Sequence, residues 1–290
     1  MVLSAARMTV TLLKLPIGFA IVLAALAGMM VAEGPFSPLR AVVFALAVLG
    51  ASGAAGAFNH YFERVQDRLM SRTRGRPFAS GALRPGAVWP ATFLGLLAAS
   101  LLMAWAVAGS LATVFVFLGA FTYGVVYTVW LKRRTVWNIV IGGLAGSFAI
   151  LAGAAAVAPE LQPVPVILAI VMFLWTPPHF WSLAAAKVDD YRAAGVPMLP
   201  AVAAERVWTA AILGHTVLLA ALSLAPLALG LGPVYGLFAA AGGGIFLWRS
   251  WQLYRAPSVR SAMANFEASL IQFSLMTAGV FLDFAVKWVL

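Results

Sequence analysis

The sequence contains no cysteine. This absence excludes disulfide bonds, iron–sulfur clusters, zinc sites built on thiolates and cysteine nucleophiles. Any catalysis therefore has to use carboxylates, amides, histidine, tyrosine or a bound metal ion.

Charged residues are also scarce, at 10% of the 290 positions, whereas 63% are hydrophobic and the mean hydropathy is +0.97. Soluble globular chains are about 25% charged and about half apolar. The composition excludes a soluble enzyme, a disordered protein and a disulfide scaffold, and it indicates a polytopic membrane protein. Nine acidic residues stand against nineteen Lys and Arg. This excess of positive charge does not predict binding to nucleic acid, because the basic residues do not lie in a soluble domain.

Nine apolar runs approach or exceed the length that crosses a bilayer, which is about 20 residues. Backbone groups within lipid have to be satisfied internally, so each run is predicted to be a helix. We expect a single integral-membrane domain over residues 1–290, an all-α bundle of about nine transmembrane helices, with the first run retained rather than cleaved as a signal peptide. The runs are Leu15–Ala32, Leu39–Phe58, Val88–Ala108, Ala112–Leu131, Asn138–Ala158, Val164–Ala186, Val207–Leu227, Val234–Trp251 and Ala268–Val289.

The basic residues are distributed unevenly across this predicted membrane. Seventeen of the nineteen lie on one side, in residues 7–14, 64–84, 132–134, 187–206 and 249–260, and only Arg40 and Lys287 lie on the other. Because Lys and Arg are retained in the cytoplasm, we predict a cytoplasmic N-terminus and a C-terminus on the opposite side. The expected location is the inner (plasma) membrane, with an active site formed by the long loops on the cytoplasmic face.

The first long loop begins with three oxygen-bearing side chains, Asn59, Glu63 and Asp67. A spacing of four residues aligns them on one stripe of a helix. Such a set suits Mg²⁺, which takes one or two carboxylates, waters and substrate phosphate oxygens. Arg72 and Arg76 follow, and guanidinium groups match phosphate geometry. The segment predicts a site for a metal and a diphosphate; the alternative is a solvated, self-neutralising helix end.

The second long loop carries the adjacent acids Asp189 and Asp190, with Lys187 close by. Two acidic centres on one face of the membrane could hold one diphosphate through bridging metal ions. Lys132 and Arg133 belong to the same face and could bind the remaining phosphate oxygens. Neither a P-loop nor a dinucleotide-binding fingerprint is present.

These residues lie in longer blocks that resemble the UbiA superfamily of intramembrane prenyltransferases, and most closely its heme O synthase branch. Residues 59–67 fit the superfamily pattern Asn-x-x-x-Asp-x-x-x-Asp, with Glu63 in the middle position. Blocks that are more specific to the branch follow in the expected order at residues 69–77, 130–143, 175–181 and 189–200. Val65, Val136 and Ala186 depart from the branch, which usually carries Asp, Pro and Tyr there, and these departures concern the details of metal coordination.

The resemblance implies a reaction and a site. The farnesyl group of farnesyl diphosphate is transferred to a vinyl group of heme B (protoheme IX), water supplies a hydroxyl group, and heme O and diphosphate leave. Mg²⁺ is the implied cofactor, the two substrates are small molecules within the membrane lipid, and a respiratory oxidase is the candidate assembly partner. The implied catalytic residues are Asn59, Glu63, Asp67, Asp189 and Asp190, with Asn59, Glu63, Asp67 and Asp190 as Mg²⁺ ligands and Arg72, Arg76, Lys132, Arg133 and Lys187 on the diphosphate.

Four further residues are candidates for contact with the heme acceptor: His60, His179, Tyr191 and Asn138. His179 follows Pro177 and Pro178 inside an apolar run, where paired prolines are expected to break or kink the helix. A histidine at membrane depth is a candidate functional residue, and the alternative for His179 is a structural hydrogen bond. Asn138 has the alternative of capping its helix.

Three other functions explain less of the sequence. A prenyltransferase for a quinone precursor or another aromatic acceptor would share the acidic motifs but not the blocks at 72–77 and 177–181. A transporter would place ionisable groups near the bilayer midplane and show internal repeats, whereas here nearly every charge is predicted at one face. A purely structural respiratory subunit would not need two acidic loops on one side.

Overall fold

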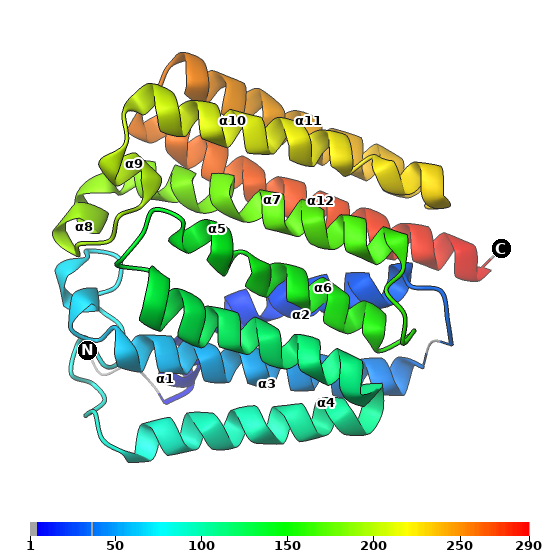
Figure 1. The fold of residues 1–290 in the computed structure, drawn as a ribbon, viewed down its shortest axis with the longest axis horizontal. Coiled ribbons are helices and arrows are strands. Elements are labelled where there is room, and N and C mark those ends of the chain that lie inside the picture. The colour runs from blue at the N-terminus through cyan, green and yellow to red at the C-terminus, as the bar shows by residue number, and fades with distance from the viewer. Residues whose placement is uncertain (1–4, 36, 290) are drawn as a thin grey trace.

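The computed structural model describes residues 5–35 and 37–289, and within these ranges the chain forms helices and no strand. The long helices lie side by side along one axis, with the two ends of the chain at opposite ends of the bundle (Figure 1). The predicted all-helical fold is therefore confirmed. The elements are α1 (Ala5–Leu12), α2 (Leu15–Val31), α3 (Pro38–Phe62), η1 (Gln66–Leu69), α4 (Val88–Phe121), η2 (Thr122–Leu131), α5 (Asn138–Gly142), α6 (Leu144–Ala155), α7 (Pro163–Ala186), α8 (Val188–Ala193), α9 (Leu199–Val202), α10 (Glu205–Leu222), η3 (Ala225–Leu229), α11 (Pro233–Arg255) and α12 (Val259–Val289).

Within the described residues, six helices are long and apolar enough to cross a membrane, and the bent pair α1–α2 makes a seventh if it counts as one span. One of the six, Val88–Leu131, contains two of the predicted runs. The chain is thus a multi-pass membrane protein, and the predicted number of nine spans is approximate. Large apolar side chains face outward, as lipid contact requires: Leu39 is 74% exposed and Leu237 is 69% exposed.

Gly109 divides α4 into two arms, at the place where the sequence predicts a connection. Its φ of 79° and ψ of −177° lie in a region that only glycine enters easily. The chain reverses there, and the second arm returns along the first and continues into the π-helical segment η2 (Figure 1).

Glycines also allow a close helix crossing between α2 and α6. A Cβ atom on Gly153 would lie 1.7 Å from the carbonyl oxygen of Ala25, and one on Gly28 would lie 2.0 Å from that of Ile150. Small residues at such crossings let membrane helices pack through their backbones. Gly28 of α2 lies against the backbone of α6, and Gly153 of α6 lies against the backbone of α2. A larger residue at either position would separate the two helices.

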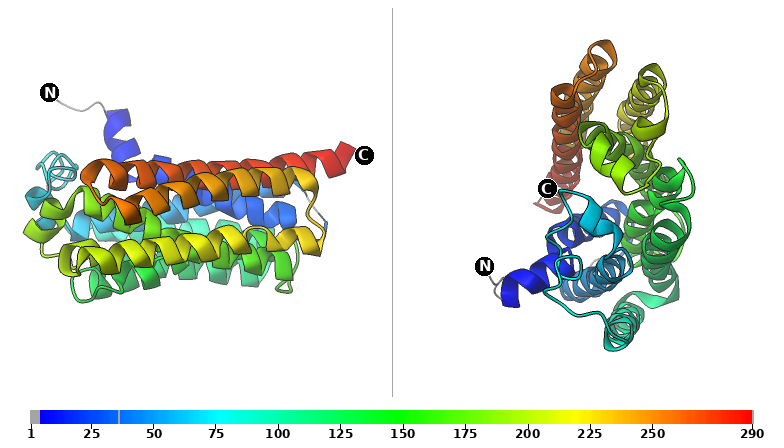
Figure 2. Two further views of the ribbon diagram at one scale, coloured as in Figure 1. Left: turned by 90° about the horizontal axis from the view of Figure 1, so that it is seen from above. Right: turned by 90° about the vertical axis from the view of Figure 1, so that its left-hand side faces the viewer.

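The helices form two groups that meet along the centre of the bundle. Helices α2, α3, α4 and α6 pack on one another, α7, α10, α11 and α12 do the same, and α6–α7 and α2–α12 contacts join the groups. Viewed from one end, the two groups lie on opposite sides of this junction (Figure 2). That end carries the loop with η1, the turn after η2, and the short helices α8 and α9 (Figure 1). The long acidic and basic segments therefore gather at one end, as the sequence predicts.

Candidate active site

The acidic residues of the first motif lie where α3 leaves the bundle. Helix α3 ends at Phe62, so Asn59, Glu63 and Asp67 do not share one continuous helix as predicted. Single backbone hydrogen bonds nevertheless continue its path, from Glu63 N to Asn59 O (2.9 Å) and from Asp67 N to Glu63 O (2.8 Å). All three side chains are buried, each residue being 2% exposed. Buried carboxylates require charge partners, and the structure supplies them.

Glu63 is paired with Lys132, which follows η2. The Lys132 ammonium donates a hydrogen bond to Glu63 Oε2, and the amide of Asn59 donates a second one to the same oxygen at 2.8 Å. Burial alone raises the pKa of Glu63, but the charge and hydrogen bond of Lys132, assisted by Lys14 and Asn59, more than offset it, so the pKa lies below its ordinary value of 4.5. Glu63 is therefore ionised at neutral pH.

Asp67 is paired with Arg76 from the same loop. One guanidinium nitrogen, Nη1, lies 2.9 Å from both carboxylate oxygens. The hydroxyl of Thr73 donates to the backbone carbonyl of Asp67 at 2.9 Å, which closes the loop over the carboxylate. The predicted phosphate-binding Arg76 is thus held at the acidic motif.

Lys14 completes this cluster, although the sequence predicts for it only a part in setting the membrane topology. Its ammonium donates to Asn59 Oδ1 and to the hydroxyl of Tyr123, both at 2.6 Å. The amide nitrogen of Asn59 then donates to Glu63 and, at 3.0 Å, to Thr128 Oγ1. Lys14 is the only non-glycine residue with positive φ in the described chain, at 50°, a conformation that costs roughly 1–3 kcal/mol. No sequence signal separates Lys14 from its neighbour Arg7, because only the bend between α1 and α2 brings it here.

The second acidic motif contributes one of its two carboxylates. Asp190 on α8 accepts hydrogen bonds from the backbone nitrogen (3.1 Å) and the hydroxyl (2.7 Å) of Ser71, which lies beside the first motif. These bonds, the hydroxyl first, hold the pKa of Asp190 below its ordinary value of 3.8. The side chain of Asp189 is 97% exposed and does not reach the cluster; its one contact is with Arg192 at 3.9 Å. Ser71 and Asp190 thus join the two long loops.

The remaining predicted residues surround this centre. Tyr191 is buried, which raises the pKa of its hydroxyl, and Arg72 reaches that hydroxyl. Lys187 is exposed, and Arg133 is exposed with its guanidinium 5.7 Å from the Phe62 ring. Arg72, Arg133 and Lys187 are all exposed, at the end of the bundle that carries the acidic cluster.

Two buried polar atoms near the cluster have no hydrogen-bond partner among the described residues, Nδ1 of His60 and Oδ1 of Asn138. The amide nitrogen of Asn138 donates to the carbonyl oxygens of Thr135 (2.6 Å) and Lys132 (3.4 Å). Asn138 therefore ties together the turn that positions Lys132. Unpaired buried polar atoms are uncommon in native proteins, so both atoms are available to a ligand.

No group of three His, Asp or Glu side chains is close enough to hold a metal ion within the described part of the chain. Each ligand type that Mg²⁺ prefers is present but is occupied by a donor of the protein: Lys14 on Asn59, Lys132 on Glu63, Arg76 on Asp67 and Ser71 on Asp190. The donor set consists of hard oxygen ligands and so fits Mg²⁺. The surrounding cations also fit a diphosphate, so the arrangement can hold a metal and a polyphosphate together.

His179 lies among aromatic rings between α7 and α12. Its ring centroid is 4.1 Å from that of Trp175 and 4.6 Å from that of Phe266, and Nδ1 is 2.6 Å from Ser269 Oγ. The sequence predicts that the paired prolines break or kink this helix; there is no break, because α7 continues through Pro177 and Pro178. The hydroxyl of Ser182 donates to the carbonyl of Pro178 at 2.6 Å, as side chains often do for backbone groups in membrane helices.

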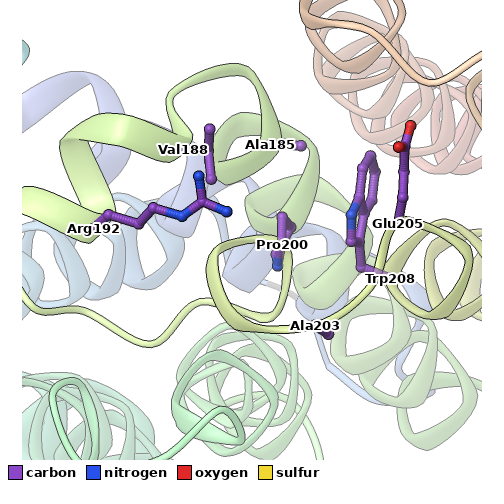
Figure 3. A pocket seen from close by; sticks show the side chains of 7 residues that line it. All are labelled: Ala185, Val188, Arg192, Pro200, Ala203, Glu205 and Trp208. Carbon is purple, nitrogen blue, oxygen red and sulfur yellow. The ribbon is translucent and has the colours of Figure 1, made fainter.

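A separate hollow of about 300 Å³ lies between α7, α8, α9 and α10. Figure 3 shows Arg192 on one wall and Glu205 and Trp208 on the other. Val188 and Arg192, one turn apart on α8, line it, whereas Asp190 bonds to Ser71. Helix α8 thus separates this hollow from the acidic cluster.

Comparison with known proteins identifies the family of this chain. Residues 21–276 match the UbiA prenyltransferase family. Two proteins of Paramagnetospirillum magneticum, named protoheme IX farnesyltransferase 2 and protoheme IX farnesyltransferase 1, are 53% and 45% identical to this chain; the alignments cover 96% of this chain and 96% and 98% of those proteins. A solved UbiA homologue from Archaeoglobus fulgidus, bound to GPP and Mg²⁺, superposes with a TM-score of 0.75 at 16% identity, over 96% of this chain and 99% of that one. The last match concerns the fold alone.

Proposed function

Because the chain belongs to the UbiA prenyltransferase family, we propose that it transfers the farnesyl group of farnesyl diphosphate to a vinyl group of heme B, with water supplying the hydroxyl group, to give heme O and diphosphate. The name of the relative that is 53% identical over nearly the whole chain supports this acceptor and this donor. The observation that carries the chemistry is the buried cluster in which Asn59, Glu63 and Asp67 are interleaved with Lys14, Lys132 and Arg76.

The diphosphate end of the donor binds at this cluster. Lys132 and Arg76 form ion pairs with Glu63 and Asp67. Further positive charge comes from Arg72, Arg133 and Lys187. Asn59, Glu63, Asp67 and Asp190 are the residues that would hold Mg²⁺, and the fold relative bound to GPP and Mg²⁺ supports a divalent metal here. Bound Mg²⁺ would neutralise the negative charge that develops on the departing diphosphate. The fixed cations of the chain stabilise that same charge without reorganising.

The isoprenoid and the acceptor lie among the helices below the cluster. The aromatic stack of Trp175 and His179, both buried, with Phe266 is the apolar region that we assign to the porphyrin. The unpaired atoms of His60 and Asn138 offer hydrogen bonds to the acceptor, with Tyr191 at the boundary between donor and acceptor. Aromatic faces also stabilise a positive charge, which the allylic group acquires when its carbon–oxygen bond breaks.

The chain acts as one integral domain in the inner (plasma) membrane. The end that carries the cluster faces the cytoplasm, because it carries most of the basic residues. A respiratory oxidase that uses the product is the candidate partner for assembly.

One experiment tests the acceptor and the reaction together. Membranes containing the protein are incubated with labelled farnesyl diphosphate, Mg²⁺ and either heme B or 4-hydroxybenzoate, and the products are identified by mass spectrometry. We expect a hydroxyethylfarnesyl heme from heme B, no product with Glu63→Gln, and full activity with Glu160→Gln, an exposed acid between α6 and α7. Labelled product from the benzoate alone would overturn the heme assignment and favour a quinone-type acceptor.

A further inference from the structure

Lys14 occupies a position that the chain bends to create. Helix α1 ends at Leu12 and α2 begins at Leu15, with an angle of 50° between them, and Lys14 takes the left-handed conformation at the bend. The lysine stem runs along α3, where a Cβ atom on Gly56 would lie 3.4 Å from three of its carbons. The stem of Lys14 thus packs against α3 at Gly56 on its way to the acidic cluster.

The contacts of Lys14 determine which way the amide of Asn59 points. The ammonium takes Oδ1 at 2.6 Å, so Nδ2 faces Glu63 at 2.8 Å and Thr128 at 3.0 Å. The amide oxygen is the only metal-ligand atom of Asn59, and it is occupied. A second bond, to the hydroxyl of Tyr123, fixes the ammonium from the opposite helix.

The same arrangement recurs at the two carboxylates. Lys132 contacts Glu63 through Oε2 and Arg76 contacts both oxygens of Asp67, so each of the three ligand residues of the first motif has a cation of the protein on it. A metal ion arriving alone would have to compete with three cations and would then face their repulsion. A metal ion arriving with a diphosphate would bring acceptors for all three.

We infer that Lys14 is an exchangeable cation, which holds the Asn59 carbonyl oxygen in the free protein and binds a diphosphate oxygen when the metal–diphosphate enters. This inference rests on the proposed function and deepens it, because it makes the binding of metal and diphosphate mutually dependent. The ammonium needs to move only from one charge-assisted hydrogen bond to another. Removing it should therefore favour the bare metal and disfavour the metal–diphosphate.

The test measures binding and needs no acceptor. Mn²⁺ binding to the detergent-solubilised full chain is followed by electron paramagnetic resonance, with Mn²⁺ alone and with Mn²⁺ plus inorganic diphosphate. For Lys14→Met we expect several-fold tighter binding of Mn²⁺ alone and about tenfold weaker binding of Mn²⁺ with diphosphate, the loss typical of one charged hydrogen bond. Lys14→Arg should restore binding with diphosphate, and Arg40→Gln, which removes an exposed cation at the other end of the bundle, should change neither.

The two affinities are expected to change in opposite directions in Lys14→Met, and this distinguishes the proposed role from a structural one. A lysine that only supports the fold would weaken both kinds of binding in Lys14→Met, and that result, or no change in either, would overturn the inference. If the methionine variant does not fold, Tyr123→Phe removes one of the two anchors of Lys14 and should show the same pair of signs at smaller size. A wild-type protein that binds no Mn²⁺ even with diphosphate would instead contradict the proposed function.

Discussion

Lys132 sets the charge state of Glu63, since burial and the lysine act on that carboxyl in opposite directions. In Lys132→Met the largest of the effects that offset burial is lost, although Lys14 and Asn59 remain, so the pKa of Glu63 rises above that of the wild type. The ionised carboxylate binds metal, and binding is lost as pH falls through the pKa. Titrating Mn²⁺ binding against pH should therefore give a midpoint at higher pH in the variant. Lys132→Arg keeps the positive charge and should stay close to the wild type; equal midpoints for all three proteins would contradict this account.

The sequence predicts least well which individual side chains reach the acidic cluster. Asp189 and Asp190 are adjacent and chemically identical, but neighbouring residues of a helix point about 100° apart. Which of them faces Ser71 depends on where α8 begins, and the motif does not encode that directly. Lys14 is a similar case, because its role depends on a bend rather than on its neighbours in sequence.

At the scale of elements, the α2–α6 crossing depends on two glycines. Gly153→Ala would place a methyl group 1.7 Å from the carbonyl oxygen of Ala25, a backbone atom that cannot turn aside. We expect Gly153→Ala to lower the midpoint of thermal unfolding in detergent by several degrees, and Gly28→Ala to behave alike. Gly95→Ala is the matched control, because a Cβ atom on Gly95 meets nothing within 4 Å, and it should be neutral or slightly stabilising. Equal effects at positions 95 and 153 would argue against this close crossing.

The two long loops are joined at Ser71 and Asp190, and the absence of native cysteine makes this contact easy to test. Ser71→Cys combined with Asp190→Cys should form a disulfide under mild oxidation, detected as a shift in gel mobility that reductant reverses. Ser71→Cys combined with Asp189→Cys is the control, because the side chain of Asp189 points into solvent. Faster cross-linking of the control pair would mean that α8 presents its other face to the first loop.

The limits of a helix follow from the sequence where the apolar run itself determines them. Lipid leaves an apolar run few alternatives to a helix, so α3, α7 and α10 begin and end near the predicted limits. At Pro177 and Pro178 the sequence predicts a break or a kink, and α7 has no break there. A proline removes only the hydrogen bond from its own nitrogen to the carbonyl four residues earlier, and packing between membrane helices keeps such a segment helical, which periodicity cannot reveal.

At the scale of the whole molecule, the placement of charge predicts orientation. Single cysteines could be introduced at Arg134, close to Lys132, and at Glu160, in the connection between α6 and α7 at the other end of the bundle (Figure 1). Each would be the only thiol in its protein. In intact cells a membrane-impermeant maleimide should label Glu160→Cys and should label Arg134→Cys only after the membrane is opened. The reverse pattern would place the acidic cluster outside the cytoplasm. The sequence alone supports this expectation, because it depends on counts of Lys and Arg rather than on side-chain geometry.

The acidic cluster draws its partners from a limited stretch of the chain, and this has a consequence for biogenesis. Domains generally fold from the N-terminus onward during synthesis. Every partner in the ion pairs of the first motif is inserted before α7 leaves the ribosome, so this half of the site can assemble while α10, α11 and α12 have yet to be made. Asp190 arrives later, and its contact with Ser71 closes the site from the second half. A nascent chain stalled after α6 should already contain the cluster formed by Lys14, Asn59, Glu63, Asp67, Arg76 and Lys132.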